Sequence, residues 1–203
     1  GIVGRHDRAE QLAVELRAGL DRINEQSRDW PRRPRVYFEE WNDPLISGIE
    51  WVEELVEIAG GTPVFPELRH AGLAKDRIVA GDEVVRRDPE VIVASWCGKR
   101  VRPATIVGRP GWNAISAVAA GHIYEIKSAL ILQPGPAALT DGVRELHDAI
   151  RRAGRTTCGL TNVRSFVLRF GLRTNSRRRR RPAGRGHSRP PLPSSSGPPA
   201  AHA

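Results

Sequence analysis

The chain of 203 residues contains no methionine, only two cysteines, and few aromatic residues, which make up 5% of it. It has no apolar run near the roughly 18 residues that span a bilayer, so we expect no membrane-spanning helix. No CxxC, HxxxH or histidine–carboxylate cluster suggests a metal site. The chain starts inside a helical pattern and shows no secretory signal. We therefore expect it to be a piece of a longer protein.

Acidic residues are absent from the end of the chain. All 23 Asp and Glu lie in residues 1–154 beside 21 Lys and Arg, whereas residues 155–203 hold the other 11 Arg. The net charge of +9 therefore belongs to this end. Because residues 155–203 are rich in Arg, Pro, Gly and Ser and have little apolar periodicity, we predict a disordered Arg/Pro-rich tail. Such a tail is either native or the product of a frameshift.

The run of five arginines at 177–181 is able to contact phosphates, so nucleic-acid binding through the tail is an alternative function of a different class. No aromatic stacking platform accompanies the run, since Phe166 and Phe170 precede it. We therefore expect no nucleic-acid partner.

Helical and strand patterns alternate along the rest of the chain. Helices are predicted over 4–27, 49–59, 82–89 and 137–154, and strands over 36–38, 90–95 and 122–126. This alternation is typical of an α/β lobe with a central parallel sheet flanked by helices. In such sheets, ligands bind outside the carboxyl ends of the strands. The loops predicted at those ends are 39–48, 95–102 and 126–135.

These loops, and the segment that follows the second one, contain residues suited to ligand binding. A loop tryptophan can present a flat apolar wall to a planar ligand, or it can pack beneath its own loop. A glycine lets a ligand approach the backbone closely. The candidate ligand-binding residues are Trp41, Trp96, Cys97, Gly98, Lys99, Trp112 and Gln133.

Cys97 also raises the possibility of a hydrolase. Lys99 and Arg100 are close enough in sequence to lower the pKa of a thiol. A nucleophilic cysteine needs a positioned histidine, however, and none of the histidines in residues 1–154 stands in a recognisable catalytic context. We therefore predict that the chain is not an enzyme, with a small residue at a tight strand-to-loop turn as the simplest role for Cys97.

Four segments together resemble the C-terminal lobe of a periplasmic binding protein. They are "WNDPLISGIEWVEELVEIAGG", "DEVVRRDPEVIVASWCGK", "RPGWNAISAVAAGHIYEI" and "LQPGPAALTDGVRELH". The family serves ABC importers of cobalamin, iron-siderophores and haem, and the chain is most similar to its cobalamin-binding branch. The resemblance covers residues 1–153. It implies two Rossmann-like α/β lobes joined by a long rigid helix, with the ligand between them.

The resemblance also implies an organisation and a function. Residues 1–29 would be part of the interlobe connecting helix, residues 34–153 the C-terminal lobe, and 155–203 the tail. The protein would bind cobalamin or a related corrinoid and deliver it to the permease, with iron-siderophore or haem binding as the alternative. No cofactor is expected beside the ligand, which is a metal chelate. We expect a monomer whose full-length form is a periplasmic or extracytoplasmic lipoprotein.

Two further positions follow from the resemblance. Asp82 and Glu83 match the family's glutamate that pairs with arginines of the permease, while a role at the start of a helix is the alternative. Arg77 stands where the best-known cobalamin binder has an aromatic residue, so we expect a pocket that is lined differently.

Overall fold

The computed structural model describes residues 4–156, in which five strands form one sheet. The strands are β1 (Arg35–Asn42), β2 (Leu45–Ser47), β3 (Thr62–Pro63), β4 (Val91–Ala94) and β5 (Ile123–Glu125). Their order is β2-β1-β4-β5, and β3 also pairs with β1. All pairings are parallel except the hairpin of β1 with β2. The predicted α/β class with a central, mostly parallel sheet is confirmed.

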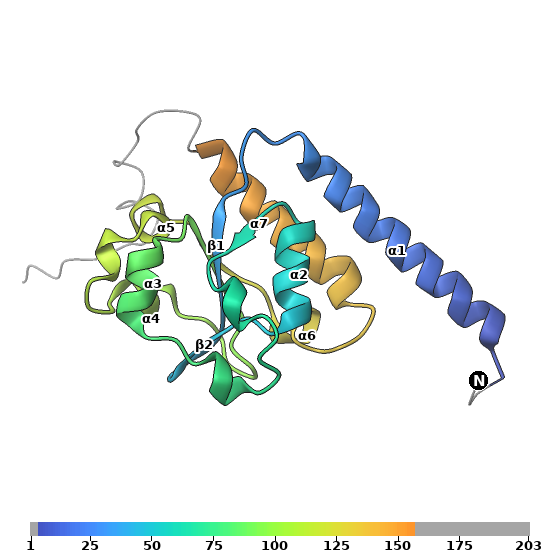
Figure 1. Cartoon of the computed structure of the whole chain (residues 1–203), viewed down its shortest axis with the longest axis horizontal. Helices are drawn as coiled ribbons and strands as arrows, with labels where there is room; N and C mark the ends of the chain where they lie inside the picture. The colour runs from blue at the N-terminus through green and yellow to red at the C-terminus, as the bar shows by residue number, and fades with distance from the viewer. Residues whose placement is uncertain (1–3, 157–203) are drawn as a thin grey trace, which may run out of the picture. The chain divides into compact units, whose positions relative to one another are not determined.

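Helices connect the strands and cover both faces of the sheet (Figure 1). They are α1 (His6–Arg28), α2 (Glu50–Ile58), α3 (Gly81–Arg87), α4 (Pro103–Val107), α5 (Ser116–Ala120), α6 (Ser128–Ile131), a π-helical turn η4 (Ala138–Gly142) and α7 (Val143–Thr156). Within residues 4–156, no helix combines the length and apolar character needed to cross a bilayer. The predicted tail lies outside the described residues from 157 onward.

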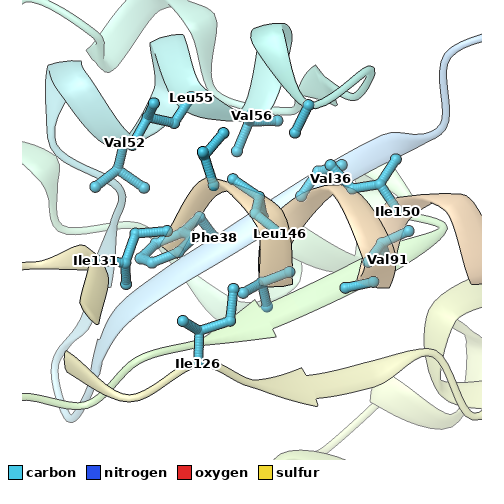
Figure 2. Packing of buried hydrophobic residues seen from close by; sticks show 14 of the residues in the cluster. Val36, Phe38, Val52, Leu55, Val56, Val91, Ile126, Ile131, Leu146 and Ile150 are labelled. Atoms are coloured by element: carbon cyan, nitrogen blue, oxygen red, sulfur yellow. The ribbon is translucent and has the colours of Figure 1, made fainter. Parts of the chain in front are cut away.

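The two faces of the sheet follow from the alternation of side chains along β1 and β4. Val36 and Phe38 join the core that packs against α2 and α7, and Figure 2 shows them beside Leu146 and Ile150 of α7. Tyr37, between them in sequence, joins a second core beneath α3, α4 and α5. Both faces are therefore buried, as expected for a sheet of mostly parallel strands.

Helix α1 packs on the lobe through its C-terminal half. Ile23 and Ser27 are buried, and the helix contacts α2, α7 and η4 (Figure 1). Leu12 and Val14, nearer its start, are exposed. This is the helix predicted over 4–27. Its role between two lobes and the domain boundaries 1–29, 34–153 and 155–203 stay predictions.

Two of the predicted loops contain regular structure. Residues 39–48 were expected to form a loop, but β1 continues to Asn42 and pairs back with β2, so this segment is mostly a β-hairpin. The backbone groups of β1 beyond Phe38 find partners in β2, which is why the strand does not end where its apolar run ends. The loop expected at 126–135 similarly contains the short helix α6.

Candidate functional site

An open hollow of about 830 Å³ lies at the carboxyl end of β4. It is lined by Asn42, Trp96, Lys99, Arg100, Val101, Arg102, Pro103, Ala104 and Thr105. These residues come from the end of β1, the segment after β4 and the start of α4. The site therefore forms where a parallel sheet offers one, beyond the carboxyl ends of adjacent strands.

The hollow carries positive charge. Lys99, Arg100 and Arg102 all line it and are exposed. The Lys99 ammonium lies 4.1 Å from the ring centre of Trp41, in cation–π geometry. The segment is anchored because the backbone N–H of Val101 donates to a Glu125 carboxylate oxygen at 3.0 Å. An anchored, cationic rim beside an indole suits a ligand that has both negative groups and a flat surface.

The buried carboxylate of Glu39 forms an ion pair with Arg109 and a hydrogen bond with Trp96, which lines the hollow. Glu39 is 0% exposed, and both of its carboxylate oxygens accept from the Arg109 guanidinium, at 2.6 and 2.9 Å. The Trp96 indole N–H donates to the same carboxylate at 2.9 Å. Glu39 and Arg109 were not among the site residues predicted from the sequence. The available signal was a carboxylate that directly follows the apolar run of β1, where a buried charge requires a partner.

Several of the predicted site residues come together at the hollow. Trp96 and Lys99 line it, and Trp41 lies against Lys99. Cys97 and Gly98 are exposed in the turn between Trp96 and Lys99. Gly98 has a φ of 69°, and no atom lies within 4 Å of a Cβ built on it. Trp96 itself is only 4% exposed, so most of its ring is packed in the second core.

Other predicted residues lie elsewhere. Trp112 is 1% exposed and packs in the second core between Tyr37 and the Arg109 guanidinium, which is 4.3 Å from its ring centre. This burial favours the packing role for Trp112 over ligand contact. Gln133 is exposed after α6 and is not among the described residues that line the hollow.

Arg77, the residue from which a differently lined pocket was predicted, is buried and donates to Glu40 at 2.5 Å and to the Ser47 carbonyl. Glu53 lies in the same polar cluster under the β1–β2 hairpin and is 3% exposed. Burial raises the pKa of Glu53 from its ordinary value of 4.5 to about 8, although Arg69, the Gly48 N–H and Arg77 act in the opposite direction. Glu53 is therefore a neutral acid at pH 7.

The geometry around Cys97 does not resemble a catalytic pair. The four described histidines each have another partner: His6 contacts Glu10, His70 contacts Glu50, His122 contacts Tyr124 and His147 contacts the Ala59 carbonyl. Among residues 4–156, no group of three or more His, Cys, Asp or Glu side chains is arranged to hold a metal ion.

Asp82 and Glu83 lie in the first turn of α3. The Glu83 carboxylate pairs with Arg87 at 2.6 Å and with Arg86, and about a quarter of its side chain is exposed. Asp82 is well exposed and lies 3.4 Å from Arg86. Intrahelical ion pairing is therefore a third role for Glu83, beside permease docking and stabilisation of the start of the helix.

Solved structures with the same fold bind different ligands. A possible iron-binding (periplasmic solute-binding) protein from Staphylococcus epidermidis aligns with a TM-score of 0.60 and 18% identity over 72% of this chain and 56% of its own. The haem-binding protein RhuT from Roseiflexus aligns with a TM-score of 0.59 and 21% identity, over 73% and 59%. The vitamin B12-binding protein BtuF of Vibrio cholerae aligns with a TM-score of 0.53 and 20% identity, over 70% and 52%.

No curated protein matches the chain. The chain spans little more than half the length of the solved structures above. The family model described as periplasmic binding protein matches residues 1–130, which is more than half of the sequence. The predicted resemblance is thereby confirmed: this chain belongs to the periplasmic binding protein family, whose members bind solutes and are not enzymes.

Proposed function

We propose that the chain is the connecting helix and C-terminal lobe of the substrate-binding component of an ABC importer. In this role it binds a metal chelate against a second lobe, outside the cytoplasm, and delivers it to the permease. The observation that carries the proposal is the hollow at the carboxyl end of β4, which combines the edge of Trp96 with an anchored cationic rim. Membership of the family supports the same role.

Two ligand classes fit this role. Cobalamin or a related corrinoid is our first candidate, and the likeness to a vitamin B12-binding protein supports it. Haem or an iron-siderophore is the second. Lys99, Arg100 and Arg102 favour this second class wherever the chelate carries carboxylates or other anionic groups, because all three residues line the hollow.

Replacing Trp96 with Ala should destabilise the lobe by about 3–5 kcal/mol, the scale for truncating a buried aromatic side chain. It should also weaken ligand binding, because the segment that carries Lys99 loses the ring packed behind it. The probes are cyanocobalamin and hemin, titrated separately against the full-length protein that contains this lobe, with affinity read by calorimetry. Binding of hemin but not of cyanocobalamin would select the second ligand class.

The matched control is Trp51→Ala. Trp51 is partly buried on α2, where its indole donates to the Ile131 carbonyl, and it belongs to the core on the other face of the sheet. Both variants are checked by circular dichroism. The proposed contact is wrong if Trp96→Ala folds and binds the probe as tightly as the unchanged full-length protein. Failure of the unchanged full-length protein to bind either probe would count against the function proposed for this lobe.

Glu83→Arg should leave probe affinity unchanged and weaken association with the permease, with a loss that shrinks as salt is raised. The physical reason is that exposed charges steer association and are screened by ions. Arg86 and Arg87 already pair with Glu83, so a purely intrahelical role predicts a small loss of stability and no effect on the permease.

The measurement uses the full-length protein containing this lobe and its reconstituted permease. Asp82→Asn is the companion variant, since Asp82 is the more exposed of the two acids. Unchanged permease binding in both variants would leave Glu83 with a structural role only.

A further inference from the structure

We propose that Glu39 is a positioning residue that holds Trp96 in the wall of the hollow. The inference rests on the proposed function, because it assigns Trp96 to the ligand-binding wall. Glu39 is itself fully buried and does not line the hollow, so it acts through Trp96.

The geometry fixes the indole ring at its polar end. An indole N–H is a donor only, so a buried tryptophan needs one acceptor in a defined place. Glu39 supplies this acceptor at 2.9 Å from the Trp96 nitrogen. Arg109 binds the same carboxylate, with its two nitrogens 2.6 and 2.9 Å from the two oxygens. The carboxylate therefore cannot rotate away without breaking a bidentate ion pair.

Arg109 is held in turn from the other side. Its guanidinium lies 4.3 Å from the ring centre of Trp112, which is buried in the second core. The segments "FEEW", "SWCGK" and "RPGW" are thus joined into one network, although Glu39 is 57 residues from Trp96 and 70 residues from Arg109 in sequence. Through Arg109, the segment "RPGW" supports Trp96 in the hollow, even though Trp112 of the same segment is buried in the second core.

Energetics also favour an orienting role. A buried ion pair adds little net stability compared with apolar side chains of similar size, because both charges lose their hydration. Tyr37, two residues earlier on the same face of β1, is also fully buried, and its hydroxyl interacts with the Glu39 carboxylate. A buried carboxylate at Glu39 is therefore better explained by what it orients than by the stability that it adds.

The test compares Glu39→Gln with Glu40→Gln in the full chain. Glu40 is the next residue of β1 and also pairs with a buried arginine, Arg77, so its substitution perturbs the strand to a similar degree without touching Trp96. The readout is the indole N–H signal of Trp96 in ¹⁵N-resolved NMR, assigned by its loss in Trp96→Phe. A double variant, Glu39→Gln with Arg109→Gln, removes the ion pair without leaving a buried charge unpaired.

We expect Glu39→Gln and the double variant to shift the Trp96 indole signal and to raise its hydrogen-exchange rate by about tenfold or more, because a charged acceptor has been lost. The affinity of the full-length protein for whichever of cyanocobalamin or hemin it binds should fall about tenfold. Glu40→Gln should change neither quantity.

An unchanged Trp96 signal in both Glu39 variants, or an equal change in Glu40→Gln, would overturn the positioning role. Unchanged probe affinity despite a displaced Trp96 would overturn it as well. If the unchanged full-length protein binds neither probe, the proposed function fails. The indole signal then still decides whether Glu39 holds Trp96.

Discussion

Gly60→Ala should destabilise the lobe by about 2–5 kcal/mol, adding the cost of overpacking to that of a left-handed backbone. Gly60 follows α2 with a φ of 96°, where side chains other than glycine are strained. A Cβ built there lies 2.5 Å from the Ser27 Cβ and 2.7 Å from the Trp30 ring. Both neighbours stand where α1 ends against the lobe, so the new methyl group should push them apart.

Gly98→Ala is the matched control. Gly98 also has a positive φ, of 69°, but nothing lies within 4 Å of a built Cβ. It should lose only the backbone contribution, about 1–2 kcal/mol. Urea unfolding monitored by circular dichroism gives both values. Equal losses for the two variants would show that the contact with Ser27 and Trp30 is not tight.

Glu53→Gln should stabilise the chain at pH 9 by roughly 3–5 kcal/mol and have little effect at pH 4.5. The folded chain holds a proton on Glu53 up to a pKa of about 8, because burial disfavours the charged form, whereas the unfolded chain releases it near 4.5. Between these values the folded state binds more protons than the unfolded state. The contribution of Glu53 to the free energy of unfolding is therefore at its maximum below pH 4.5. It falls as the pH rises and becomes constant again above pH 8.

Glutamine mimics the neutral acid and does not titrate, so the variant should lose this pH dependence. Glu54→Gln, an exposed neighbour on α2, serves as the control and should follow the unchanged chain. The measurement is the free energy of unfolding at half-unit steps from pH 4.5 to pH 9. Burial also lowers the pKa of His147, so the difference between variant and unchanged chain is the informative quantity. Parallel curves for Glu53→Gln and the unchanged chain would contradict the assignment.

Periodicity predicted most of the fold. The three- and four-residue spacing in residues 4–27 located α1, and the apolar run at 90–95 located β4, because each pattern reports directly on a buried face. The hairpin after Phe38 was missed since polar residues dominate its sequence. Its pairing partner, β2, is only three residues long and carries little signal of its own.

The sequence predicted where the candidate site lies in the fold but not which side chains contact one another there. Topology alone places ligands beyond the carboxyl ends of parallel strands, which led to Trp96 and Lys99. No local pattern distinguishes Trp112, which is buried, from Trp41, which lies beside the hollow. The pairing of Glu39 with Arg109 joins residues 70 positions apart, so it becomes visible only when the chain is folded.

The placement of α7 has a consequence for biosynthesis. This helix, the last described element, covers the face of the sheet formed by Val36, Phe38, Val91 and Val93. A nascent chain that has made all the strands and α2 still presents to water the part of that face that α7 covers, until residues 143–156 emerge. Because such unprotected apolar surface promotes association between chains, a transcript cut short within α7 should yield aggregates instead of a smaller working lobe.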